Sequence, residues 1–222
     1  MNQATSTAQT LPLLSTRPQS MPAGKQPCLV DAQHPLRAQV EQFIAQRFLD
    51  IHGARISSFM PLLIALLSED GKILAAVGIR SAASEALFLE HYLDTSVQQA
   101  ILSNAGWAMP APQRDHIVEI GNLASIDRHA SRKLFKALAG MLQAENFDWA
   151  VFTGCSSLQR MFKTMGIETI GLGRALQSRL PVDQQTWGSY YEDNPQVVAG
   201  KVSRGSILLG RDPAALSGRA AA

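Results

Sequence analysis

Basic side chains gather at the start of a helix that follows an apolar strand, within residues 117–142. Four of them lie in the first turns of that helix, namely Arg128, His129, Arg132 and Lys133. Cations are unfavourable there, because the N-terminus of a helix already carries partial positive charge. A bound anion would explain them, since free backbone N–H groups and arginines together hold phosphates. The alternative is that they extend into water while Asp127 supplies the usual N-terminal anion.

A single carboxylate interrupts the apolar strand before this helix. Glu119 lies two residues before Gly121. A half-buried carboxylate there would have a raised pKa and could act as a general base. The alternative is a structural carboxylate that pairs with an arginine or faces solvent. The neighbouring Asn122 could bind a substrate amide or cap the loop.

A second group of polar residues lies in the segment LFLEHYLD, residues 87–94, of which 87–93 predict a short strand. Strand alternation would place Glu90 and Tyr92 on one face of the sheet and His91 on the other. The first two would then shape the polar end of a substrate site. The alternative is an exposed strand edge, which suits His91 better than Glu90.

Aromatic residues and one thiol complete the candidates. Trp187, Tyr190 and Tyr191 belong to the turn-like segment WGSYY, and they either contact substrate as part of a lid or anchor the end of the fold. A tyrosine hydroxyl could protonate a departing thiolate. Cys155 precedes a helix, which could lower the pKa of its thiol. Without an identifiable histidine base, we interpret it as an ordinary buried or half-buried thiol.

Apolar periodicity predicts the elements that must position these residues. A helix is expected over 34–54, ending at Gly53, and Asp70-Gly71 between two apolar runs predicts a hairpin, because a type I′ turn needs positive φ. Further helices are expected at 95–106, 127–144 and 156–166, and further strands at 116–123, 148–154, 167–173 and 197–202. Ser156 and Gly166 are the expected cap and stop of the helix over 156–166. The expected buried stripe of the helix over 127–144 comprises Leu134, Phe135, Leu138, Met141 and Leu142.

This order of elements predicts the fold class. A hairpin that feeds a βαβ unit is typical of an α/β protein whose mixed sheet carries helices on both faces. A right-handed crossover would place the helix with Arg132 against the sheet. We expect one domain over 34–202, a disordered or loosely attached arm over 1–33, and a C-terminal tail over 203–222 in which Ile207–Leu209 could dock.

Composition limits the classes of function. The chain has 222 residues, of which 46% are hydrophobic, and its net charge is +2, which gives no reason to expect a nucleic-acid partner. Two cysteines are too few for a disulfide framework or a metal cluster. The N-terminal segment is a poor signal peptide and no apolar run reaches about 18 residues, the length of a membrane span. We therefore expect a cytoplasmic protein without a transmembrane segment or a metal.

Several of these segments together resemble one family. FMPLLIALL, AAVGIRSA, LFLEHYLD, VEIGNLAS, WAVFTG and WGSYY are similar, in this order, to the thermostable hemolysin family, and the resemblance covers residues 37–201. The family name describes a haemolytic phenotype and not a reaction. The implied fold is similar to that of the GNAT acyltransferases, and the order of elements predicted above agrees with it.

The resemblance implies where an acyl donor would bind. In the GNAT fold a thioester inserts where two central parallel strands splay, and its pantetheine arm follows the next loop and helix, which corresponds here to Leu123 through Arg132. The implied donor-binding residues are Leu123, Ala124, Arg128, Ser131, Arg132 and Lys133. The loop SIDRHAS, residues 125–131, departs from many GNAT members because it has no glycine. That bulk argues against a tight clamp on the pyrophosphate of coenzyme A.

The acyl-homoserine lactone synthases, which are similar in fold, take acyl groups from acyl carrier protein. Their strand also carries a glutamate before a polar break, as Glu119 does here. An acyl carrier protein is acidic, so the resemblance implies that it would dock on a basic patch. That patch would comprise Arg128, Arg132, Lys133 and Lys136.

The resemblance thus implies an N-acyltransferase that moves an acyl group from acyl carrier protein or coenzyme A to a small amine, such as an amino acid. Glu119 would deprotonate the amine, directly or through water, and Tyr190 would protonate the thiolate. Backbone N–H groups near Leu123 and Ala124 would polarise the thioester carbonyl. The amine would be oriented by Glu90 and Asn122, and the site would be shaped further by Tyr92, Trp187 and Tyr191. No permanently bound cofactor is expected.

Two other functions stay open. The family name suggests a membrane-active haemolytic protein without catalysis, although the chain has no evident long amphipathic lytic helix. The missing glycine loop also allows a catalytically dead module that only binds acyl groups.

Overall fold

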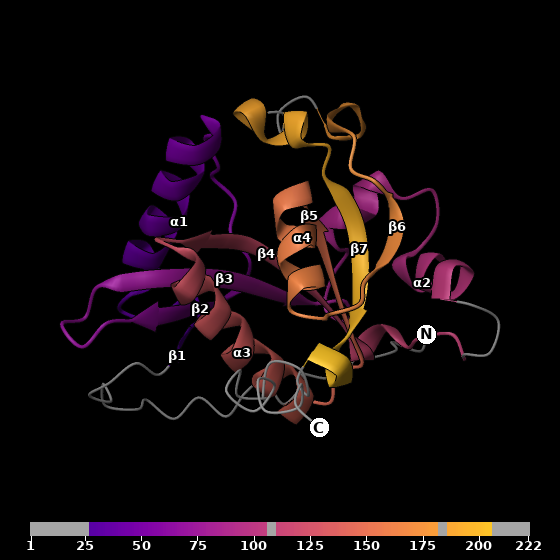
Figure 1. Cartoon of the computed structure of the whole chain (residues 1–222), viewed down its shortest axis with the longest axis horizontal. Coiled ribbons are helices and arrows are strands. Elements are labelled where there is room, and N and C mark those ends of the chain that lie inside the picture. The colour runs from indigo at the N-terminus through magenta and orange to yellow at the C-terminus, as the bar shows by residue number, and fades with distance from the viewer. Residues whose placement is uncertain (1–26, 106–109, 182–185, 206–222) are drawn as a thin grey trace, which may run out of the picture.

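One mixed β-sheet organises the chain (Figure 1). A computed structural model describes residues 27–105, 110–181 and 186–205. Its strands within these ranges are β1 (Pro27–Val30), β2 (Leu62–Leu67), β3 (Ile73–Ser81), β4 (Ile117–Ser125), β5 (Trp149–Gly154), β6 (Ile170–Arg174) and β7 (Gln196–Lys201). They form the order β1-β2-β3-β4-β5-β7-β6. Only β4 and β5 pair in parallel among them, so the predicted mixed sheet with a βαβ unit is confirmed.

Helices cover both faces of the sheet, as the order of elements predicts. The helices are α1 (Arg37–His52), α2 (Val97–Ala105), α3 (Arg128–Ala144) and α4 (Ser156–Thr164). Ile64 of β2 packs in one core with α3 and α4, whereas the adjacent Leu63 packs in another core with α1. Successive strand residues point to opposite faces, so α1 lies on the face opposite to α3. In Figure 1, α1 covers the end of the sheet near β2 and α2 lies beside β6.

Local sequence signals account for most of the element boundaries. Gly53 ends α1 with a φ of 66°, and Gly71 supplies a φ of 79° in the hairpin between β2 and β3. Asp127 caps α3, accepting the N–H of Ala130 at 2.7 Å. Four residues of the predicted α3 stripe are buried and Met141 is half-buried. Gly166, with a φ of 73°, follows α4 as predicted.

The predicted strand over residues 87–93 is wrong. The chain instead forms a short 3-10 helix, η1 (Phe88–Tyr92). The N–H groups of Phe88 and Leu89 bond to a side-chain carboxylate of β4, so no neighbouring strand is needed to satisfy them. The expected alternation of Glu90 and Tyr92 against His91 therefore does not apply.

Smaller differences concern the ends of elements. Pro27–Val30 lies in the predicted N-terminal arm but forms edge strand β1, because Val30 and its neighbours pair with β2 and Val30 is fully buried. Ser156 is the first residue of α4 and not its cap, which is Cys155. Residues 202–205 add one helical turn after β7. The predictions for Gly106 and for Ile207–Leu209 lie outside the described residues.

Candidate active site

The two parallel strands separate at the centre of the sheet. β4 and β5 pair from Ile117 opposite Trp149 to Ile120 opposite Phe152. Beyond that point both strands continue, but they no longer pair with each other. A bulge bends β4 there. The register of β3 leaves Asn122 and Leu123 together opposite one residue, and Asn122 has a φ of 51°.

A cavity of about 830 Å³ opens at this separation. Its volume lies within the range of ~300–1,000 Å³ that small-molecule sites occupy. Its wall includes the diverging ends of β4 and β5, the start of α3, and α4. The end of α1 and a second 3-10 segment, η5 (Gly188–Asp193), contribute residues from the other side.

The segment WGSYY is docked on the end of α1. The hydroxyl of Ser189 donates to the carbonyl of His52 at 3.2 Å, and Arg55 N donates to the carbonyl of Thr186 at 3.0 Å. Gly188 has a φ of 53°, and a Cβ there would overlap the carbonyl oxygen of His52. A glycine is therefore required where this segment crosses α1.

Glu119 lies in the wall of the cavity and is only 3% exposed. Its Oε2 accepts the N–H of Phe88 and its Oε1 accepts the N–H of Leu89, each at 2.9 Å. Burial raises the pKa of the Glu119 carboxyl, while the two N–H groups and the nearby Arg80 oppose that rise. The predicted half-buried carboxylate is thus almost fully buried and faces the cavity.

The structure adds Arg80 to the site, which the sequence analysis did not select. Arg80 of β3 lies directly opposite Glu119 in the strand register and also lines the cavity. Its Nη1 lies 3.9 Å from Glu119 Oε2, and its Nε lies 3.1 Å from Glu85 Oε1. The only signal for it in the sequence is a charge at the end of the apolar run AAVGI.

Glu90 is not brought to the cavity. Arg114 donates to it bidentately, from Nη1 to Oε1 at 2.8 Å and from Nη2 to Oε2 at 2.7 Å. Its two oxygens also accept the N–H groups of Leu87 and Val97. The hydrogen bond from Arg114 is the main cause that lowers the pKa of Glu90 to about 2, against burial. This carboxylate therefore ties η1 to the start of α2.

Aromatic side chains make one wall of the cavity. Tyr92, Trp187 and Tyr190 line it, whereas Tyr191 is absent from the wall and shares a hydrogen bond of 2.5 Å with the hydroxyl of Tyr92. Burial raises the pKa of Tyr191 to about 12 and also raises those of Tyr92 and Tyr190. The hydroxyl of Tyr190 donates to the carbonyl of Thr153 at 3.3 Å.

His52 is a further cavity residue that the sequence analysis missed. Its ring packs edge-on against Tyr190, with centroids 5.3 Å apart, and it lines the cavity. Burial lowers the pKa of His52, and the nearby Asp193 opposes that change. The residue is inconspicuous in the sequence because it lies in the last turn of α1.

Asn122 lines the cavity, but its amide is already engaged. Its Oδ1 accepts the N–H of Met60 at 2.8 Å, and its Nδ2 donates to the carbonyl of Ser58 at 3.4 Å. The side chain thus holds the segment before β2 against the bulge of β4. Met60 also occupies the space beside Gly121, where a Cβ would lie 2.5 Å from Met60 Cε.

Most of the predicted donor-binding residues lie together in the cavity wall. They are Leu123, Ala124, Arg128, Ser131 and Arg132. Lys133 and Lys136 are exposed on α3 and are not part of that wall. Ser131 is buried and its hydroxyl lies 2.5 Å from that of Ser125. Cys155 also lines the cavity, with its Sγ 3.0 Å from Ser157 Oγ.

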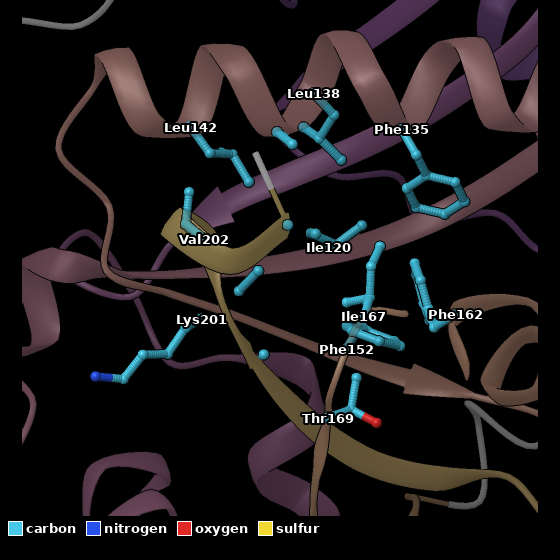
Figure 2. Close-up of a pocket in the computed structure, with 14 residues that line it drawn as sticks. Ile120, Phe135, Leu138, Leu142, Phe152, Phe162, Ile167, Thr169, Lys201 and Val202 are labelled. Atoms are coloured by element: carbon cyan, nitrogen blue, oxygen red, sulfur yellow. The ribbon is translucent and has the colours of Figure 1, made fainter. Parts of the chain in front are cut away.

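A smaller apolar pocket of about 60 Å³ adjoins the cavity (Figure 2). Both are lined by the same four residues, namely Ile120, Phe135, Phe152 and Phe162. In Figure 2, Phe135 and Phe162 lie at one side of the small pocket, and Leu142 and Val202 lie at the other. Figure 2 also shows the ammonium of Lys201 pointing away from it. These four side chains thus lie between the cavity and an apolar recess beneath α3.

Residues 27–105, 110–181 and 186–205 offer neither a candidate metal cluster nor a candidate membrane span. No group of three or more histidine, cysteine, aspartate or glutamate side chains in these ranges could hold a metal ion. Within the same part of the chain, no helix is long and apolar enough to cross a membrane.

Solved structures share this fold at low sequence identity. The acyl-homoserine lactone synthase LasI superimposes with a TM-score of 0.55 at 12% identity, covering 84% of this chain and 95% of that one. The coenzyme A-dependent acyl-homoserine lactone synthase BjaI, with SAM and isopentyl-CoA, gives 0.55 at 13% identity, covering 84% and 90%. FeeM, an N-acyl amino acid synthase from uncultured soil microbes, gives 0.56 at 11% identity, covering 85% and 100%. These likenesses confirm the predicted GNAT-like fold.

Sequence comparison adds the family. No curated protein sequence matches the chain. The model of the family described as "Thermostable hemolysin" matches residues 30–206, which include every strand of the sheet except most of β1. The predicted resemblance is confirmed, and this chain belongs to the thermostable hemolysin family.

Proposed function

We propose that the protein is an N-acyltransferase that moves an acyl group from a thioester to a small amine. The observation that carries this proposal is Glu119, a buried carboxylate that faces a large cavity where β4 and β5 separate. The fold is that of the acyl-homoserine lactone synthases LasI and BjaI and of the N-acyl amino acid synthase FeeM. The position of the carboxylate is suited to proton removal from an amine in the cavity.

The donor would enter between the separated strands. Its pantetheine arm would lie along Leu123 and Ala124, and its phosphate would meet Arg128 and Arg132 in the cavity wall. The acyl tail would extend toward the apolar recess beneath α3. Apolar burial contributes about 0.8 kcal/mol for each methylene removed from water, so this recess would favour an acyl chain over an acetyl group.

The reaction needs one proton to move. The amine nitrogen attacks the thioester carbonyl carbon, the C–S bond breaks, and the thiolate leaves. Glu119 takes the proton that the amine loses, and that proton returns to the thiolate. Each oxygen of Glu119 accepts one backbone N–H from the described residues, so lone pairs stay available for the amine. The raised pKa of Glu119 brings its basicity closer to that of a working general base near neutral pH.

Tyr190 would act on the leaving sulfur as a hydrogen-bond donor. Burial raises the pKa of Tyr190, whereas a free thiol has a pKa of about 8.5. Complete transfer of the tyrosine proton to the thiolate is therefore unfavourable. The hydroxyl, now bonded to the carbonyl of Thr153, would instead turn to the developing negative charge.

Acyl carrier protein is the donor that we propose first. Lys133 and Lys136 are exposed on α3 beside the arginines of the cavity mouth, where an acidic carrier could dock. The loop over 125–131 has no glycine, which leaves less room for a backbone clamp on coenzyme A. BjaI is coenzyme A-dependent, so acyl-coenzyme A is the donor to compare with it.

The test is thiol release from a panel of acyl carrier protein and acyl-coenzyme A donors, with pooled amino acids and amines as acceptors. We expect release that depends on the acceptor, together with an acylated amine detected by mass spectrometry. Donor binding without release would indicate a module that only binds acyl groups. Leakage of liposomes by the protein alone, with no release from any donor, would contradict the proposal and favour a membrane-active protein.

A further inference from the structure

Arg80 is an unusual side chain because it is largely buried and is not fully paired with the described residues around it. Its side chain is 16% exposed, and its Nε is buried without a hydrogen-bond partner in the described part of the chain. Glu85 lies 3.1 Å from that Nε as an ion pair, but not with the geometry of a hydrogen bond. An arginine carries five N–H donors, and leaving donors unpaired away from water is costly. This guanidinium therefore has capacity for a further acceptor.

Glu119 does not use that capacity. It is the cross-strand partner of Arg80, but the closest approach is 3.9 Å, from Nη1 to Oε2. The two oxygens of Glu119 are instead held by the N–H groups of Phe88 and Leu89. The carboxylate is thus fixed by the backbone, and the guanidinium stands beside it in the same cavity wall.

The charge of the cavity favours an anionic ligand. Its described wall contains five arginines, on α1, β3, α3 and α4, against two carboxylates, Glu119 and Asp193. Four of the arginines lie on helices, and Arg128 and Arg132 belong to the helix start where the donor would bind. Arg80 is separate from these, because it is the arginine of that wall that pairs with Glu119. A donor phosphate on α3 would leave Arg80 free for another group.

We propose that Arg80 binds a carboxylate of the acceptor, so that the acceptor is an α-amino acid or a compound with the same adjacent amine and carboxylate. In such a molecule a single carbon joins the amine to the carboxylate. The amine would meet Glu119 while the carboxylate meets Arg80. Nη1 of Arg80 and Oε2 of Glu119 are 3.9 Å apart. Arginine is suited to this task because its planar fork binds carboxylates bidentately. This inference deepens the proposed function and rests on it.

Glu85 would act as a positioning residue for this interaction. It lies outside the cavity wall, its side chain is 49% exposed, and it holds the Nε edge of Arg80. Arg80 itself lines the cavity, and its Nη1 is the atom that approaches Glu119. We therefore expect Glu85→Gln to raise the KM for the acceptor more than it lowers kcat.

The test compares an amino acid with its own carboxamide and its decarboxylated amine, with the best donor held constant. We expect kcat/KM for the amino acid to exceed those of both analogues by about 10- to 100-fold, the range for one charge-assisted interaction. Arg80→Met should remove that preference by slowing only the amino acid, and Arg80→Lys should restore part of it. Arg174→Met, on β6 and outside the cavity wall, is the matched control.

A binding measurement separates this inference from the proposed function. N-decanoylphenylalanine should raise the Tm of the protein more than its carboxamide does, and Arg80→Met should abolish the difference. Acylation of amines with no preference for a carboxylate would overturn the role of Arg80 while leaving the acyltransferase intact. An equal loss with all acceptors in Arg80→Met would also overturn it. Absence of acylation with every donor and acceptor would instead remove the proposed function, and the inference with it.

Discussion

Two glutamates that bind backbone N–H groups at η1 have opposite environments. Glu119 of β4 lies in the cavity wall, where burial raises its pKa and the nearest guanidinium nitrogen is 3.9 Å away. Glu90 lies within η1 itself, outside that wall, and a bidentate arginine lowers its pKa to about 2. Both accept two backbone N–H groups.

The difference between them is the distance to a cation. Arg114 neutralises Glu90 at hydrogen-bond distance, so that carboxylate stabilises structure and has little tendency to accept a proton. Arg80 stays farther from Glu119, so that carboxylate keeps its basicity. Residue type and a polar neighbourhood are therefore insufficient to identify a general base. The distance to a cationic partner decides which glutamate can readily accept a proton.

The largest expected effect is the loss of activity when Glu119 is substituted. Glu119→Gln should lower kcat/KM for amine acylation by about 10²- to 10⁴-fold, the usual contribution of a general base. The amide preserves the size of the side chain but cannot accept the proton. Steady-state kinetics with a saturating donor provide the measurement. Glu145→Gln, at the end of α3, is a control of the same chemistry. Full turnover in Glu119→Gln would remove the assignment.

The second prediction concerns stability. Glu90→Gln should lower the free energy of unfolding by about 2 kcal/mol, because it removes a charged hydrogen-bond partner and leaves Arg114 partly unpaired. Activity per folded molecule should stay close to that of the wild type, since Glu90 is not in the cavity wall. Urea denaturation and kinetics on the same samples measure both. A loss of turnover without a loss of stability would contradict the structural role assigned to Glu90.

The two carboxylates should also respond differently to pH. Acylation should rise with pH through the raised pKa of Glu119, because only the ionised form takes a proton. The stability that Glu90 contributes is present above its usual pKa of 4.5 and is lost as pH falls toward about 2. Between pH 4.5 and about 2, the denaturation midpoint should therefore change less with pH in Glu90→Gln than in the wild type. Parallel acid curves for both proteins would contradict this assignment.

The smallest expected effect tests the fork of Arg114. Arg114→Lys keeps the charge but replaces two parallel hydrogen bonds to Glu90 by one contact at most. The expected cost is about 1 kcal/mol of unfolding free energy, the size of one hydrogen bond. Thermal denaturation at neutral pH measures it. If Arg114→Lys were as costly as Glu90→Gln, charge would not be what holds η1 to α2.

Much of the cavity wall formed by β4 and α3 could be predicted from the sequence. The period of the apolar residues identifies β4, α3 and β5, and their order places Glu119, Arg128 and Arg132 near one end of the parallel strands. These inferences succeed because they depend on local patterns and on the handedness of a βαβ unit. Asp127 also caps α3 as a common N-terminal residue does.

The part of the cavity wall around Arg80 and His52 could not be predicted in the same way. Residues 88–92 have the composition of a strand, but their conformation is set by bonds to Glu119, about 30 residues away in the chain. Arg80 becomes significant only through the register between β3 and β4. His52 becomes significant only because η5 docks on α1. Each depends on tertiary contacts that no local pattern records.

The docking of η5 on α1 also has a consequence for the order of folding. The bond from Ser189 to His52 spans 137 positions of the chain, and the bond from Thr186 to Arg55 spans 131. Contacts of such separation have a large loop-closure cost and form slowly compared with hairpins and helices. The sheet from β2 to β5 can therefore assemble during synthesis before the aromatic wall exists. The chain would gain its complete cavity only after the last residues of η5 and β7 have been made.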